Sequence, residues 1–156
     1  MIQDFDSQLQ VSLRALEEVV APALAGAEKH VVEQLHLAML TIGFVKQRLP
    51  EARRFARWEL SAYIDLAREL GEDAALASFI ADGTAELQRP GADIADFELI
   101  TRRGRDAIAA FVDASGDRRV ADKVLEGSKP IVDQARLWCA PFGFELRPEA
   151  LPAAAW

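Results

Sequence analysis

Apolar residues recur at intervals of three and four positions along nearly the whole chain, beginning with Phe5, Leu9, Leu13, Leu16 and Val20. This spacing places the apolar side chains on one face of an α-helix. A half-buried strand would instead alternate apolar and polar residues, and no window does so convincingly. The pattern therefore predicts an all-α protein.

Proline and glycine divide this pattern into separate helices. We expect helices over residues 5–20, 27–49, 50–70, 72–88 and 93–114, and one kinked helix or two helices over 118–140 around Pro130. Because the connections are short, the fold class is an antiparallel bundle of five or six helices. Residues 1–140 are expected to form a single helical-bundle domain.

The last segment, residues 141–156, is expected to be an extended tail because it holds three prolines. Its apolar residues are Phe142, Phe144, Leu146, Leu151 and Trp156. Apolar side chains in an extended tail usually dock on a surface. We expect this tail to dock on the bundle or on a partner subunit.

Composition indicates which partners and which cellular compartment to expect. The 156 residues carry a net charge of −7, and neither half is basic, so nucleic acid is not expected as a partner. The single cysteine, Cys139, excludes an intrachain disulfide and is expected to be an inert buried thiol in a reducing cytoplasm. The acidic N-terminus is unlike a signal peptide. The longest uncharged run, residues 35–45, is too short to cross a bilayer, so no membrane association is expected.

The segment 27–49 has apolar residues on two sides. At about 100° per residue, one stripe includes Val32, Leu35, Met39 and Ile42, and a second stripe on the far side holds Leu37, Leu40 and Phe44. A helix that is apolar on two sides is buried on two sides. This helix is therefore expected either to be central in the bundle or to meet another copy of the chain with its second stripe.

The same segment holds both histidines of the chain, His30 and His36. They lie about 120° apart around the helix, so they cannot bind one metal ion together. Glu33 and His36 are neighbours on one face, with the Glu-x-x-His spacing that some helical bundles use for metal ligands. Glu59 falls within the apolar stripe of the next helix, where a carboxylate is costly unless it is paired or metal-bound.

These residues define a candidate divalent-metal site at Glu33, His36 and Glu59. Without metal, a Glu–His pair of this kind is also suited to act as a general base. The alternative is structural. Glu33 then pairs with Lys29, His36 is satisfied beneath a neighbouring helix, and Glu59 pairs with an arginine of another helix.

A second candidate site is basic. Arg53, Arg54 and Arg57 lie near the start of the expected third helix, where free backbone N–H groups favour an anion such as phosphate or carboxylate. The alternative is a solvated corner in which these arginines pair with acidic neighbours.

No complete catalytic constellation and no glycine-rich phosphate loop is present in the sequence. We therefore expect a binding or interaction module that forms a homo-oligomer and takes a protein partner or a small apolar ligand. The alternative is a metal-dependent helical-bundle enzyme, similar in chemistry to an oxidoreductase, that uses the Glu-x-x-His pair.

Overall fold

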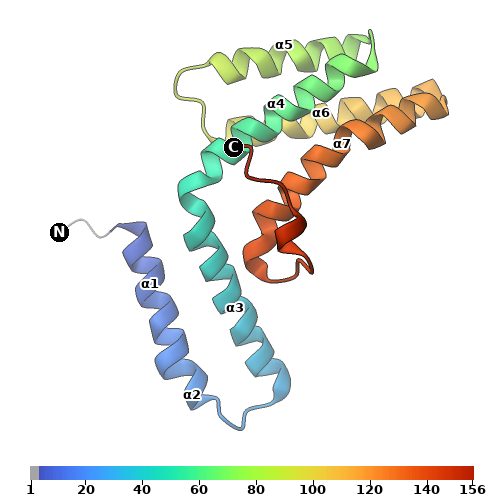
Figure 1. Ribbon diagram of the computed structural model, residues 1–156. Coiled ribbons are helices and arrows are strands. Elements are labelled where there is room, and N and C mark those ends of the chain that lie inside the picture. The colour runs from blue at the N-terminus through green and yellow to red at the C-terminus, as the bar shows by residue number, and fades with distance from the viewer. Residues whose placement is uncertain (1–3) are drawn as a thin grey trace. The chain divides into compact units, whose positions relative to one another are not determined.

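The computed structural model describes residues 4–156 and is all-α, as the apolar spacing predicted (Figure 1). The long helices are α1 (Phe5–Ala15), α3 (Lys29–Arg48), α4 (Ala52–Leu70), α5 (Ala74–Gln88), α6 (Ile94–Ser115) and α7 (Arg118–Cys139). Shorter elements are η1 (Leu16–Val20), α2 (Ala21–Ala23), η2 (Leu49–Glu51), η3 (Ala140–Phe142) and η4 (Pro148–Ala150).

The described chain divides into two compact units. We call residues 4–50 and 138–150 the hairpin unit, because α1 and α3 form its body. We call residues 51–137 and 151–156 the core unit. The prediction of a single domain over residues 1–140 is not tested by this division and stays a prediction.

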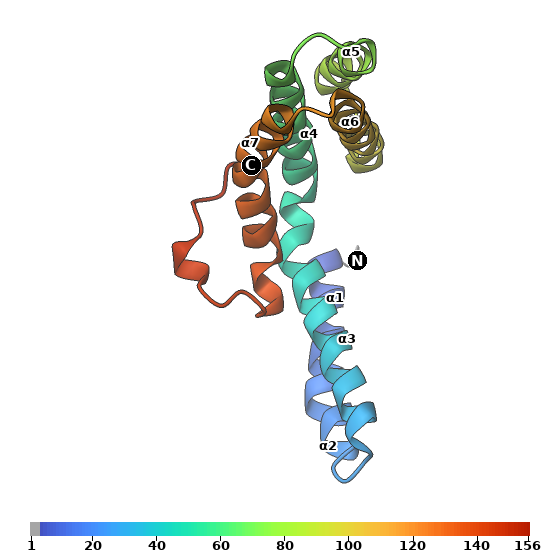
Figure 2. The same ribbon diagram turned by 90° about the vertical axis from the view of Figure 1, so that its right-hand side faces the viewer.

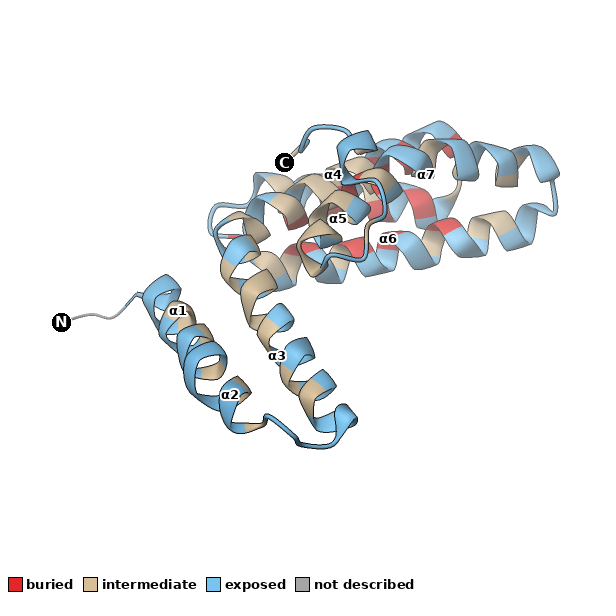
Figure 3. Ribbon diagram, turned by 60° about the horizontal axis from the view of Figure 1, so that its bottom comes forward, coloured by how far each residue is buried: buried red, intermediate tan, exposed pale blue. Residues whose placement is uncertain are grey.

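The core unit owes its stability to three mutually packed helices, α4, α5 and α6. Its fully buried side chains include Leu60 and Ile64 of α4, Leu76 of α5 and Phe97 of α6 (Figure 3). Burial of one such side chain contributes about 1.5–3 kcal/mol. The close packing of α5 on α6 requires Gly104, because a Cβ built there would lie 2.3 Å from the ring of Phe79.

Aspartates cap the first turns of α5 and α6 in the core unit. Asp73 accepts hydrogen bonds from the amides of Ala75 and Leu76, and Asp93 forms a reciprocal capping box with Asp96. In the hairpin unit Asp4 caps α1 in the same way, through the amide of Ser7. These contacts satisfy the free N–H groups of the first helical turn.

In the hairpin unit α1 and α3 run side by side (Figures 1 and 2). After Ala15 the helix widens into the π-turn η1, in which the amide of Ala21 donates to the carbonyl of Leu16. Pro22 follows directly and lacks the amide that a regular helix would need there. The chain turns through residues 24–28 into α3.

None of the described residues in the hairpin unit is buried. Figure 3 accordingly shows no buried colour on α1 or α3. This differs from the central position predicted for residues 27–49. Within the hairpin unit, α1, η1, η3 and Trp138 of α7 pack on α3, and they leave apolar residues on both of its sides partly exposed.

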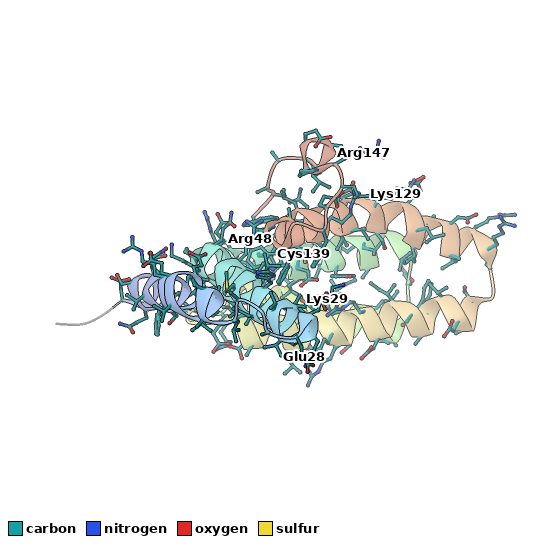
Figure 4. The ribbon with its side chains drawn as sticks, turned by 90° about the horizontal axis from the view of Figure 1, so that it is seen from below. Glu28, Lys29, Arg48, Lys129, Cys139 and Arg147 are labelled. Atoms are coloured by element: carbon teal, nitrogen blue, oxygen red, sulfur yellow. The ribbon has the colours of Figure 1, made fainter. Side chains whose placement is uncertain are left out.

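Residues 138–150 pack on α3. Phe142 of η3 stacks on Phe44 with ring centroids 4.3 Å apart, and Trp138 meets Phe44 edge-on at 6.2 Å. Arg48 donates from Nε to the carbonyl of Trp138 at 2.8 Å (Arg48 and the adjacent Cys139 are labelled in Figure 4). Cys139 is exposed, which corrects its expected burial.

The last six residues return to the core unit. Gln134 of α7 donates to the carbonyl of Ala153 at 2.8 Å and accepts from the amide of Ala155 at 2.9 Å. The side chain of Gln134 is thus buried with both ends of its amide satisfied.

One expected helix boundary shifts, and one open alternative is settled. Pro50 lies in the short 3₁₀ turn η2, so α4 begins at Ala52 and not at Pro50. Of the two alternatives for residues 118–140, the structure has one helix, α7, with Pro130 inside it.

Candidate functional site

The main opening of the hairpin unit is a groove of about 550 Å³ along α3. From α3 it is lined by His36, Met39, Leu40, Gly43, Phe44 and Gln47; Leu13 and Glu17 line it from α1 and η1, and Pro141 from η3. Its lining is thus mainly apolar with a few polar residues, His36, Gln47 and Glu17, the usual composition of a binding site. We call this opening the α3 groove.

Large apolar side chains of the hairpin unit are exposed. On α3, Leu37 is 47% exposed and Leu40 is 40% exposed, and Val11 and Val19 on the other arm of the hairpin are 64% and 66% exposed. Single exposed apolar residues are ordinary on a protein surface, but a concentration on one small unit without a core marks an interaction surface.

The residues proposed as metal ligands lie in different settings. Glu33 is exposed and forms an ion pair with Lys29 at 3.4 Å, as the structural alternative predicted (Lys29 is labelled in Figure 4). His36 is exposed and lines the α3 groove. Glu33 and His36 belong to the hairpin unit and Glu59 to the core unit.

Within residues 4–156, no group of three or more His, Cys, Asp or Glu side chains is placed to hold a metal ion. Glu33, His36 and Glu59 are divided between the two units, so this ligand set is not tested. The metal site stays a hypothesis from the sequence.

Glu59 is half-buried on α4, and its burial raises the pKa of its carboxyl group. Arg105 of α6 opposes that rise in pKa, whereas the negative charge of Glu98 adds to it. The charge that stabilises the Glu59 carboxylate across helices is thus Arg105, the kind of partner that the structural alternative predicted.

Arg105 also lies over the ring of Tyr63, with 5.8 Å from Cζ to the ring centroid. Burial raises the pKa of the Tyr63 hydroxyl, and the positive charge of Arg105 opposes the rise. Tyr63 and Arg105 line a cavity of about 360 Å³ in the core unit, with Asp113 and Ser128 as its other polar residues. The lining of the cavity is mostly apolar, and Arg105 interacts there with two residues of α4, Tyr63 and Glu59.

The arginines of the candidate anion site contact their own chain. Arg53 donates from Nε to the carbonyl of Ala92 at 2.9 Å, and Arg57 donates to the carbonyl of Leu87. Arg54 pairs with Glu51 at 3.3 Å, which is the acidic-neighbour contact of the alternative interpretation. Arg53 and Arg57 thereby tie α4 to the turn between α5 and α6. Anion binding at these residues stays a prediction.

Sequence reasoning identified two residues of the α3 groove within the second stripe, Leu40 and Phe44. It missed Gly43, Glu17 and Pro141, since the last two come from elements whose packing on α3 no local pattern reveals. A signal for the groove does exist in the sequence: His36, Leu40, Gly43 and Gln47 follow each other at steps of four, three and four, the spacing of a helix-packing seam.

Comparison with protein-family models, with curated proteins and with solved structures found no match in any of the three. No helix among residues 4–156 is both long enough and apolar enough to cross a lipid bilayer.

Proposed function

We propose that this protein is an interaction module that self-associates through its hairpin unit. The observation that carries the proposal is the contrast between the two units. The core unit buries large side chains completely, whereas the hairpin unit has an apolar helix pair and no buried residue. The hairpin unit is therefore incomplete as a folding unit in a single chain.

The energetic argument concerns helix stability in water. Most helical stability in proteins comes from packing an amphipathic face and not from helix propensity. Helix α3 has 20 residues and carries apolar side chains on both sides, yet Leu37 and Leu40 remain 47% and 40% exposed after α1, η1, η3 and Trp138 have packed against it. Burying this remaining exposed surface of Leu37 and Leu40 would contribute roughly 0.6–1.4 kcal/mol for each side chain.

A protein partner suits this surface better than a small ligand does. The exposed apolar residues extend over both arms of the hairpin, well beyond the α3 groove. A second copy is the simplest such partner, because two helix hairpins together can form a four-helix arrangement with a shared core.

A reducing, cytoplasmic setting belongs to the proposal, because Cys139 is the only cysteine and is exposed.

Sedimentation of the full chain over about 1–100 μM tests the proposal, since association depends on concentration. We expect a mass of twice 17.2 kDa or more at the upper end. The Leu37→Asp/Leu40→Asp variant should sediment as a monomer. The matched control is Leu125→Asp/Val132→Asp, at positions of α7 that are 66% and 53% exposed, and it should associate like the wild type. A monomeric wild type at every concentration overturns the proposal.

A further inference from the structure

Four residues of α3 that line the α3 groove form a seam that can pair with the same seam of a second copy. The seam consists of His36, Leu40, Gly43 and Gln47. In an antiparallel helix pair of this type, each layer joins two different seam positions, one from each helix. Pairing Leu40 with Gly43 and His36 with Gln47 uses all four residues, and both pairs are centred between Thr41 and Ile42. The seam is thus complementary to its own copy.

Gly43 has no role in the packing of its own chain. A Cβ built on Gly43 would meet no atom within 4 Å. The other helical glycines differ: at Gly83 and Gly127 such a Cβ would lie 2.7 Å from Ile64 and 2.5 Å from Leu66. A glycine inside a helix costs about 0.5–1 kcal/mol relative to alanine. The free space at Gly43 therefore calls for an occupant from outside the chain.

We infer that a second copy of this chain lays its α3 antiparallel along the α3 groove, with Leu40 of each copy over Gly43 of the other. This inference rests on the proposed self-association and names its surface and register. Leu40, at 40% exposed, is the large side chain of the seam, and Gly43 is the position where a helix can approach most closely. Such a contact is isologous, so both copies bury the same surface.

The ends of the seam are polar and match each other. His36 and Gln47 would meet at both ends of the contact, and an imidazole and a carboxamide each offer a donor and an acceptor. The four seam residues include no lysine, arginine, aspartate or glutamate. The next position toward the N-terminus is Glu33, whose pairing with Lys29 keeps its charge at the exposed end of the seam.

The charge order along α3 favours the antiparallel orientation. Lys29 of its first turn is paired with Glu33 of the next, whereas Lys46 and Arg48 lie in its last turn. In the register centred between Thr41 and Ile42, an antiparallel copy brings Glu33 level with position 50 of the other copy, just past Arg48, and it also opposes the two helix dipoles. A parallel copy would place like charges together.

Disulfide trapping in the full chain tests the register. The background is Cys139→Ser, and separate Leu40→Cys and Gly43→Cys chains are mixed and mildly oxidised. We expect mixed disulfide dimers to form at least about tenfold faster than dimers of either chain alone, because a disulfide requires Cα atoms within about 7 Å. The matched control is Val45→Cys. This position is 39% exposed, as Leu40 is at 40%, and lies about 140° around the helix from it.

The possible results distinguish the claim of self-association from the claim of an antiparallel register. If the wild type associates but the mixed pair crosslinks no faster than Val45→Cys, the register is overturned and self-association stands. Faster Leu40→Cys homodimers would show a parallel pair and also overturn the register. A monomeric chain that carries a small molecule in native mass spectrometry overturns both claims.

A second variant tests the contact at Gly43, with a separate measurement of folding. Gly43→Leu fills the α3 groove and should block association by at least about tenfold, because overpacked contacts are costly. Circular dichroism at low concentration should show its helix content unchanged. Gly43→Leu chains that fold and associate like the wild type would contradict the inference.

Discussion

The indole N–H of Trp156 donates a hydrogen bond to the carboxylate of Glu51, with 3.0 Å between Nε1 and Oε2. The same indole ring meets Phe55 edge-on, with centroids 5.1 Å apart. These contacts join the end of the described chain to the start of α4. Trp156 therefore serves the stability of the core unit, whereas self-association is assigned to the hairpin unit.

Substitutions at Trp156 test this separation. Trp156→Phe removes the hydrogen bond and keeps a ring, so the free energy of unfolding should fall by about 1 kcal/mol. Trp156→Ala also removes the ring and should cost about 2 kcal/mol or more. Urea denaturation measures both changes. Leu146→Ala, at a position 93% exposed, is the control and should change stability by less than about 0.5 kcal/mol. A Trp156→Ala protein as stable as wild type would contradict the docking of this residue.

Thr101 offers a stabilising substitution. Its hydroxyl oxygen is buried in α6 and has no hydrogen-bond partner among the described residues. Thr101→Val keeps the shape and removes the unsatisfied group, so it should raise the free energy of unfolding by about 1 kcal/mol. Thermal denaturation at fixed concentration measures it. Thr101→Ala, which leaves a cavity, should not stabilise. A destabilised Thr101→Val protein would mean that the hydroxyl has a partner in solution.

Two glycine-to-alanine substitutions should act in opposite directions. Gly104→Ala places a Cβ 2.3 Å from the Phe79 ring and should cost about 1–3 kcal/mol. Gly43→Ala meets no atom within 4 Å and should stabilise the dilute, monomeric chain by about 0.5–1 kcal/mol. Chemical denaturation of both variants at low concentration measures the contrast. Equal effects at the two positions would contradict the packing described for α5 and α6.

Glu59 should make stability depend on pH. Burial raises its pKa above the ordinary 4.5 in the folded chain, so in this range the unfolded chain binds fewer protons than the folded one. Stability therefore falls as the pH rises from about 4.5 through the folded-state pKa. Glu59→Gln should remove this fall, seen as a smaller difference in unfolding free energy between about pH 4 and pH 7.

The control for this experiment is Glu69→Gln, on the exposed side of the same helix. It should leave the wild-type pH profile unchanged. If Glu59→Gln keeps the full fall in stability between the two pH values, the half-buried carboxylate is not its source.

Local chemistry made much of the fold predictable. Helix spacing and the residues that end helices act within a few positions, so the helix expected over residues 93–114 lies within one residue of α6 at both ends. The placement of α3 was not predictable in this way. Two apolar sides on a helix indicate two contacts, but they do not say whether the second contact is made within the chain or with another chain.

The residues of the α3 groove were only partly predictable, because the sequence does not show which elements pack on α3. The Glu-x-x-His spacing and the i,i+4 pairing of Glu33 with Lys29 are both visible in the sequence, but the exposure of Glu33 and His36 depends on which elements pack on α3. Gly43 likewise gained meaning only when its surroundings showed free space where other helical glycines have close neighbours.

The most direct test of self-association through the hairpin unit is hydrogen–deuterium exchange at two protein concentrations. We predict that amides of α3 exchange more slowly at the higher concentration, because association buries the helix that a single chain leaves without buried residues. Amides of α4 and α6, whose side chains are buried within one chain, should exchange equally at both concentrations. Exchange in α3 that does not change with concentration would contradict the account.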